Sequence, residues 1–261
     1  IDLNTSFTGE DSLDISIDAG NGSSTGALSE FDLNGYTGAT TGDADELTVD
    51  GISYTFPVGD VTVMVGDSVD GSSLYTVACA YGTPSDTMDD CGAPNAVFVG
   101  GGSTLAASYD FDNGFSAAIG YSGDGHTANG LVTTEGLDSY GANVAYTGDT
   151  YGVSVSYAQT DSLIGGGKTV DDTYTAINAY WTPEGNFPSV SFGYEWGDDG
   201  SEATTADELT SYFVGVQFDE FGPGTFGAAL GTKTPTVEST SELLMYEAFY
   251  SYPVNDGMTI T

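Results

Sequence analysis

The feature that most constrains this chain is an alternation of large apolar residues with small or polar ones, repeated from one end of the sequence to the other. Residues 190–196, VSFGYEW, are the clearest example. Successive side chains of a strand point to opposite faces, so each such segment predicts a strand with one apolar face. The alternation predicts an all-β chain of about fourteen strands, at residues 1–9, 11–19, 46–57, 59–67, 103–112, 115–122, 138–147, 150–160, 172–183, 188–197, 209–219, 224–232, 242–254 and 257–261.

The connections between these strands are short and long in strict turn. The short ones are rich in turn-forming Gly, Asn, Asp and Pro, at residues 9–11, 57–60, 112–114, 148–150, 184–188, 220–224 and 255–257. The long ones are polar, at residues 20–46, 67–102, 122–137, 161–171, 198–208 and 233–241. Tight turns at one end and long loops at the other predict a transmembrane up-and-down antiparallel β-barrel of outer-membrane type. A soluble β-sandwich is the alternative, and it predicts no such asymmetry.

Aromatic residues flank nearly every short turn. In a barrel they would lie at one height and form the girdle expected at a membrane–water interface. The strand faces would then be apolar outward to lipid, and small and polar inward to water. The predicted girdle residues are Phe56, Phe111, Phe115, Tyr146, Tyr151, Trp181, Phe187, Phe218, Phe226 and Tyr252.

The number of strands suggests a longer protein. A membrane crossing needs about 9–11 residues, and the last predicted strand, 257–261, is half that length. Bacterial barrels are closed and usually even-stranded. We therefore expect residues 1–261 to be a single barrel domain that lacks about one strand at each end, with sixteen strands in the complete protein.

Charge excludes several classes of function. The formal net charge is −37, with 39 acidic residues against only Lys168 and Lys233. Nucleic acid and anionic lipid are both bound through basic patches, so neither is an expected partner. A solvated acidic coil is also excluded, because 39% of the residues are hydrophobic.

The two cysteines, Cys79 and Cys91, lie in a loop rich in Gly, Pro and Asp. They form no Cys-x-x-Cys pair and the only histidine is His126, so a zinc site is not expected. A disulfide is the simplest interpretation and indicates an oxidising, extracytoplasmic compartment; two free thiols are the alternative.

Eight segments have strand patterns in common with one known family. They are residues 3–9, 19–21, 47–58, 61–66, 106–111, 211–217, 227–231 and 246–256. These segments resemble cyanobacterial outer-membrane porins of the carbohydrate-selective (OprB-like) family, the type that carries an N-terminal S-layer-homology domain, although that domain is not in this sequence. The resemblance implies a homotrimeric channel in the outer membrane of a Gram-negative-type bacterium, passing small hydrophilic solutes.

Residues 67–102 form the longest connection, and a long loop inside a compact fold usually has a function. In general porins the corresponding loop folds into the lumen and narrows it. By that analogy we expect residues 67–102 to fold inward, stiffened by a Cys79–Cys91 bridge. A loop that lies outside the barrel is the alternative. The predicted constriction residues are Asp67, Asp70, Asp86, Asp89 and Asp90. A lumen lined by carboxylates, without arginine, predicts a preference for cations.

Catalytic and metal motifs are weak. Residues 22–26 match a nucleophile-elbow pattern but lack its strand-to-helix context, and residues 167–169 lack the upstream glycine of a phosphate loop. Residues 110–114 resemble the opening of a calcium loop but equally make a hairpin turn, and the acidic residues 43–46 and 198–199 could bind Ca²⁺ loosely.

The sequence therefore predicts a non-enzymatic porin without a cofactor, apart from loosely bound Ca²⁺ at acidic loops. Its partners would be outer-membrane lipid, further copies in a homotrimer, and small solutes and cations. An acidic secreted or surface β-protein that assembles through calcium is the alternative function. A barrel enzyme is the weaker rival, because His126 lies in a loop.

Overall fold

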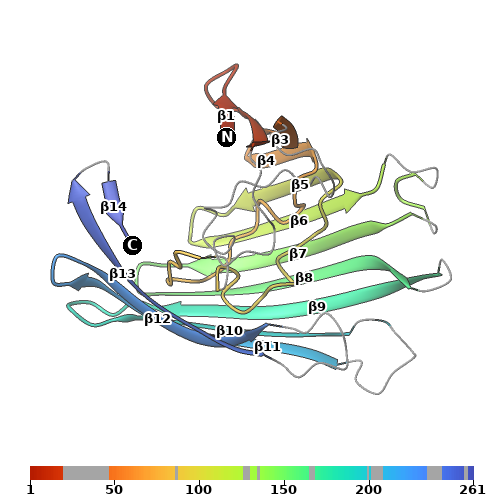
Figure 1. The fold of residues 1–261 in the computed structure, drawn as a ribbon. Coiled ribbons are helices and arrows are strands. Elements are labelled where there is room, and N and C mark those ends of the chain that lie inside the picture. The colour runs from red at the N-terminus through yellow and green to blue at the C-terminus, as the bar shows by residue number, and fades with distance from the viewer. Residues whose placement is uncertain are drawn as a thin grey trace.

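One antiparallel sheet of fourteen strands makes up the computed structural model, with every strand beside its neighbours in the sequence (Figure 1). The structure describes residues 1–19, 47–85, 88–125, 130–133, 136–164, 168–198, 200, 208–233, 243–255 and 258–261. The strands are β1 (Asp2–Thr5), β2 (Ser12–Ala19), β3 (Leu47–Val58), β4 (Val61–Asp67), β5 (Ser103–Asp110), β6 (Phe115–Gly123), β7 (Asp138–Thr147), β8 (Tyr151–Ile164), β9 (Lys168–Trp181), β10 (Ser189–Asp198), β11 (Glu208–Phe221), β12 (Gly224–Lys233), β13 (Leu243–Asn255) and β14 (Met258–Ile260).

The predicted all-β, up-and-down antiparallel architecture is confirmed. The sheet curves around the segment between β4 and β5, which lies on its concave side (Figure 1). Among the described strands, β1 pairs with β2 and β14 with β13, so the sheet is not closed. The described part of the chain contains no helix long and apolar enough to cross a membrane.

The two faces of the sheet are chemically opposite. On β7, Ser139, Gly141 and Asn143 are buried on the concave side, while Tyr140 and Val144 are exposed on the convex side. The same alternation continues across neighbouring strands, because the register aligns Val144 with Val155 and Asn143 with Ser156. Large apolar side chains thus face outward. Exposed examples from six strands are Leu105, Ile119, Val144, Val155, Phe192 and Leu230.

One predicted long connection is much shorter in the structure. The sequence predicts a polar loop at residues 161–171, but β8 runs to Ile164 and β9 starts at Lys168. The register pairs Asp161 with Asp171 and Ser162 with Val170, so the hairpin continues well past the predicted end. The antiparallel backbone ladder therefore continues through a segment that is rich in polar residues.

The first predicted strand is shorter than expected, because β1 ends at Thr5 rather than at residue 9. The Asp11 carboxylate organises the chain that follows. It accepts hydrogen bonds from the amides of Phe7 at 3.1 Å and Thr8 at 2.7 Å, and from the hydroxyl of Tyr54 at 2.7 Å. The bonds from Phe7 and Thr8 are local and turn the backbone before β2 begins, while the bond from Tyr54 ties this turn to β3.

Candidate functional site

The candidate site is the inner loop, residues 68–102, which crosses the concave face of the sheet. Its outgoing half is extended, so every second amide N–H points toward the sheet. Four of these amides, at residues 76, 78, 80 and 82, each donate to a side chain on a different strand. The bonds are Thr76 to Asn143 Oδ1 at 3.0 Å on β7, Ala78 to Ser154 Oγ at 2.9 Å on β8, Ala80 to Ser191 Oγ at 2.8 Å on β10, and Gly82 to Gln217 Oε1 at 2.8 Å on β11.

The returning half of the loop is held by Glu195 of β10, whose side chain is 1% exposed. Its Oε2 accepts the amides of Asn95 at 2.9 Å and Ala96 at 2.7 Å, and its Oε1 accepts Asn95 Nδ2 at 2.7 Å. A buried carboxylate is costly unless it is hydrogen-bonded, and charge-assisted bonds of this kind offset that cost. Glu195 therefore fixes the loop from beneath.

Glu247 of β13 makes a second carboxylate anchor near the far end of the loop. It accepts the hydroxyl of Tyr81 at 2.9 Å and that of Thr83 at 2.8 Å, and it also bonds Ser85 Oγ. Burial, followed by the hydrogen bond to Glu247, raises the pKa of Tyr81 above its usual value. The Tyr81 hydroxyl therefore remains a donor to the carboxylate across the physiological range.

A third carboxylate, Asp70, closes the base of the loop. Its Oδ1 accepts the amides of Ser72 and Val99, both at 2.8 Å, and its Oδ2 accepts the Ser72 hydroxyl at 2.7 Å. Backbone bonds from Gly71 to Val99 and from residue 68 to residue 102 join the same two ends of the loop. Asp70 thus ties the outgoing half to the returning half.

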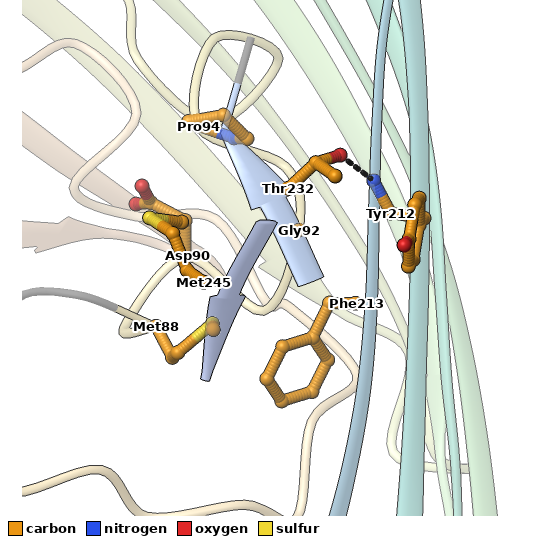
Figure 2. A pocket seen from close by; sticks show the side chains of 8 residues that line it. All are labelled: Met88, Asp90, Gly92, Pro94, Tyr212, Phe213, Thr232 and Met245. Carbon is orange, nitrogen blue, oxygen red and sulfur yellow. Dashed lines mark hydrogen bonds between the residues drawn. The ribbon is translucent and has the colours of Figure 1, made fainter. Parts of the chain in front are cut away.

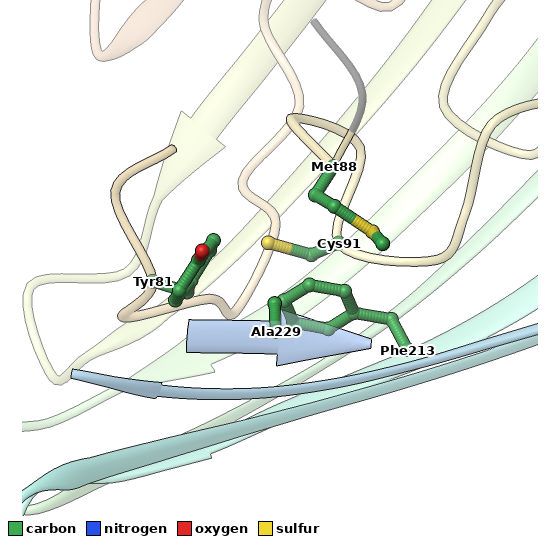
Figure 3. Packing of buried hydrophobic residues seen from close by; sticks show 5 residues of the cluster. All are labelled: Tyr81, Met88, Cys91, Phe213 and Ala229. Atoms are coloured by element: carbon green, nitrogen blue, oxygen red, sulfur yellow. The ribbon is translucent and has the colours of Figure 1, made fainter. Parts of the chain in front are cut away.

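The disulfide predicted between Cys79 and Cys91 is confirmed, with 6.4 Å between the two Cα atoms. It joins the two halves of the loop beside an apolar cluster built from the loop and the sheet (Figure 3). The ring of Tyr81 packs edge-on against Phe213 at 5.5 Å and Phe249 at 5.6 Å. The other buried members shown in Figure 3 are Met88, Cys91 and Ala229.

This cluster corrects the expectation that the inner face is uniformly small and polar. Phe213 of β11 lies on that face, between the buried Ser211 and Gly215, and is fully buried beneath the loop. A large apolar side chain is tolerated there because loop atoms, not water, cover it.

Between the loop and strands β11 to β13 the packing is tight. Met88, Asp90, Gly92 and Pro94 of the loop lie close to the sheet residues (Figure 2). The cavity that these residues line has a volume of about 10 Å³. That volume is about what one water molecule needs, so the loop leaves no ligand pocket at this contact. The sheet residues lining it are Tyr212, Phe213, Thr232 and Met245.

A larger opening lies beside the base of the loop. It has a volume of about 290 Å³ and is lined by residues 100–102 and by residues of β6, β7 and β8. Its walls are mostly glycine, hydroxyl and carboxylate, with Asp124 and Asp161 the acidic members. The long-connection end of the sheet therefore presents a polar, acidic recess.

The structure places four of the five predicted constriction residues, two at the base of the loop and two near its far end. Asp67 is exposed at the end of β4, and Asp70 is held in the loop base as described above. Asp89 is exposed and Asp90 half-buried near Cys91 at the far end. Asp86 lies outside the described residues, as do His126 and residues 22–26, 43–46 and 199.

The predicted aromatic residues lie along the ends of the strands that the short turns join. Phe115 and Tyr146 pack with ring centroids 4.9 Å apart, and Tyr146 lies 5.4 Å from Tyr151. Tyr151 is in register with Trp181, and Phe218 with Phe226. Most of the band is exposed on the convex side or in the turns: Phe111, Phe115, Tyr151, Trp181, Phe187 and Tyr252. Phe56 stacks on Tyr54 at 5.2 Å.

Sequence reasoning did not assign Glu195 and Glu247 to the site. The sequence does indicate that both side chains face inward. Alternation puts Glu195 on the same strand face as Ser191 and Gly193, and it puts Glu247 on the face opposite to that of the exposed Tyr246. A carboxylate on the inner face of a strand cannot be matched to its loop donors without the three-dimensional path of the loop.

The metal candidates can be placed in part. Residues 110–114 form the β5–β6 turn, in which Asp110 and Asn113 side chains accept the backbone amides of Asp112 and Phe115. Among the residues that the structure describes, no three His, Cys, Asp or Glu side chains are grouped so as to hold a metal ion.

Comparisons with known proteins identify the architecture. An anion-selective porin from Comamonas acidovorans superposes with a TM-score of 0.51 and 16% sequence identity, over 95% of this chain and 71% of that one. In-vitro folded OmpT, an outer membrane protein of Vibrio cholerae in its trimer form, superposes with a TM-score of 0.52 and 14% identity, over 95% of this chain and 79% of that one. No family model and no curated protein matches the sequence. The fold is therefore that of outer-membrane porin barrels.

Proposed function

We propose that this chain forms an outer-membrane porin, a passive channel for small hydrophilic solutes and ions. The observation that carries the proposal is the reversed polarity of the sheet. Its convex face exposes large apolar side chains such as Ile119, which is 63% exposed, while its concave face is lined by serine, glycine and asparagine. A soluble protein would bury that apolar face, whereas a barrel presents it to lipid.

The aromatic residues at the short-turn end support this assignment. Exposed aromatic side chains in a band suit the headgroup region of a membrane, where one side of the ring is apolar and the other wet. Bacterial barrels have short turns at the periplasmic end. The proposal places the band at the periplasmic interface and the longer connections, with the acidic recess, outside the cell.

Charge supports a preference for cations. Glu195, Glu247 and Asp70 face the lumen side, with Asp89 and Asp90 near the far end of the inner loop. The only two basic residues, Lys168 and Lys233, lie at strand ends. Such a lumen has a negative potential that favours cations and admits small neutral solutes. One structural neighbour is an anion-selective porin, so this fold alone does not dictate the sign of selectivity.

The finer expectations are part of the same proposal. A homotrimer is supported by the trimer form of one structural neighbour. Membership of the carbohydrate-selective porin family, and with it the passage of sugars, rests on the segment resemblances in the sequence. Neither implies catalytic turnover.

Swelling of proteoliposomes tests the proposal. Detergent-extracted protein is reconstituted into liposomes, which are diluted into isosmotic solutions of a pentose, a disaccharide and a large dextran. Rapid swelling in the pentose, slower swelling in the disaccharide and none in dextran is the expected result. Protein that stays in the aqueous phase without detergent and precipitates with Ca²⁺ would contradict it, and would favour a calcium-assembled surface protein.

A further inference from the structure

Four glycines on the concave side of the sheet lie directly beneath the inner loop. They are Gly120 of β6, Gly141 of β7, Gly193 of β10 and Gly215 of β11. The absence of a side chain lets loop atoms approach the strand backbone more closely than any other residue would allow. The row crosses the sheet in the same direction as the outgoing half of the loop, whose amides bond to β7, β8, β10 and β11.

The contacts leave no room for a methyl group. An ordinary contact between nonbonded heavy atoms is about 3.5 Å. A Cβ added at Gly193 would lie 1.8 Å from the carbonyl oxygen of Cys91, and one at Gly120 would lie 2.0 Å from that of Gly71. At Gly141 it would lie 2.3 Å from the carbonyl oxygen of Tyr157 on the neighbouring strand β8, and 2.6 Å from the Tyr75 hydroxyl of the loop. At Gly215 it would lie 2.6 Å from the ring of Phe213 on the same strand, and 3.0 Å from the Tyr81 ring of the loop.

Gly193 faces the most strongly fixed point of the loop. Cys91 is tied to Cys79 by the disulfide, and its carbonyl oxygen accepts Asn178 Nδ2 at 2.9 Å. Its backbone has a φ of 49°, the left-handed region that non-glycine residues rarely adopt. Because the obstructing atom is a backbone carbonyl held on several sides, a side chain at Gly193 would lift the loop rather than rotate a neighbour aside.

Other inward glycines have a different role, which makes the row distinctive. A Cβ at Gly152 would meet the ring of Tyr180 at 2.3 Å, and one at Gly227 would meet the ring of Phe249 at 2.2 Å. Those rings belong to adjacent strands and cover the glycines within the wall. Gly120, Gly141, Gly193 and Gly215 therefore contact the loop, whereas the nearest atoms to Gly152 and Gly227 belong to the wall.

We infer that Gly120, Gly141, Gly193 and Gly215 determine the pore size by setting how deeply the inner loop sinks against the barrel wall. The inference rests on the proposed channel function. With glycine at these positions the loop lies against the strands and leaves the remaining cross-section open. A side chain at any of them pushes the loop toward the pore axis, which narrows the path for solutes.

Gly193→Ala is the test, with Gly101→Ala as the matched control in the same loop. A methyl group at Gly101 would have no other atom within 4 Å, and this glycine has no positive φ, so its substitution is expected to be silent. Single-channel conductance should fall by roughly 1.5- to 2-fold in Gly193→Ala, because the narrowest section sets the current. Disaccharide entry into proteoliposomes should fall more than pentose entry.

Hydrogen exchange in detergent separates this inference from the channel function itself. Faster exchange at Ala96 and Ala80 in Gly193→Ala would show that the loop has been lifted, whether or not the protein conducts. Lifted amides with an unchanged conductance would overturn the inference while leaving the porin proposal standing. A conductance higher than that of the wild type would also overturn the inference. It would show that the substitution releases the loop from the pore instead of pushing the loop toward the pore axis. Absence of channels in the wild type would contradict the porin proposal.

Gly215→Ala keeps the test decisive if Gly193→Ala does not fold. Its methyl group would meet the Phe213 and Tyr81 rings at 2.6 and 3.0 Å, contacts less severe than the 1.8 Å at Gly193, so a smaller displacement of the loop and a folded protein are expected. A smaller fall in conductance, in the same direction, is the expected result. A conductance equal to that of Gly101→Ala would overturn the inference.

Discussion

In the barrel wall, β7 and β8 pair residue by residue from Ser139 opposite Thr160 to Thr147 opposite Gly152. In the inner loop, residues 76–82 have no such ladder and bond instead to single side chains on four strands. The wall is thus held by a repeated backbone pattern, and the loop by a few individual acceptors. A wall position can lose one side chain with little effect, whereas each loop anchor is hard to replace.

The largest effect is expected at the most buried anchor. Glu195→Ala removes the acceptor of three donors, the amides of Asn95 and Ala96 and the side chain of Asn95. Leaving them unpaired should destabilise the folded protein by about 4 kcal/mol. Denaturant unfolding in detergent measures this, and hydrogen exchange at Asn95 and Ala96 locates it.

Glu195→Gln is the control for charge, because one carbonyl oxygen remains as an acceptor. It should cost about half as much as Glu195→Ala. Unchanged exchange at Asn95 in the alanine variant would show that the returning half of the loop is held by other contacts.

The wall should respond to charge on one face only. Ile119→Lys puts an ammonium group at the middle of β6 on the convex face, where lipid contact should cost about 3 kcal/mol of folding free energy. The matched variant Ser108→Lys puts the same group on the concave face of β5. Folding efficiency into liposomes should fall for the first and not for the second. Equal behaviour of the two variants would contradict the membrane-facing assignment.

A neutral anchor should matter less than Glu195. Ser154→Ala removes the acceptor of one loop amide, that of Ala78, and should destabilise the protein by about 1 kcal/mol. Ser16→Ala is the control, because that hydroxyl bonds to Asp2 on the neighbouring strand at 2.6 Å and not to the loop. If both variants unfold at the same denaturant concentration, the row of side-chain acceptors does not hold the loop.

The smallest effect is expected at the β1–β2 turn, and only in acid. The hydrogen bond from Tyr54, with those from Thr8 and Ser6, holds the pKa of Asp11 well below its usual value. A lowered folded-state pKa gives stability that is present above the unfolded pKa of about 3.9 and lost as the pH falls below it. Melting temperature should therefore be insensitive to Asp11 between pH 7 and pH 5.

The acid dependence can be assigned by two variants. Asp11→Asn should remove part of the fall in melting temperature below about pH 4. Glu10→Gln, an exposed neighbour in the same turn, should not change it. If melting temperature depends on pH in the same way in the wild type and in Asp11→Asn, Asp11 does not contribute to the loss of stability in acid.

The wall could be predicted from the sequence because its information is local. Alternation such as that of residues 190–196 fixes which face each residue takes, and turn residues fix where strands end. The inner loop could be identified only by its length and its cysteines. Its anchors, such as Glu195 and Asn95, are 100 residues apart in sequence, and nothing in either local pattern points to the other. The alternation also did not predict that Phe213 faces inward. Its burial depends on the loop that covers it, and the local sequence does not show the path of that loop.

The most direct test of this account is the reversal potential of the wild-type protein in a planar bilayer with a salt gradient across it. Discrete conductance steps with a potential favouring cations are predicted, because the concave side of the sheet and its loop carry carboxylates and the chain has only two basic residues, both at strand ends. A potential favouring anions, or no conductance steps at all, would contradict the account.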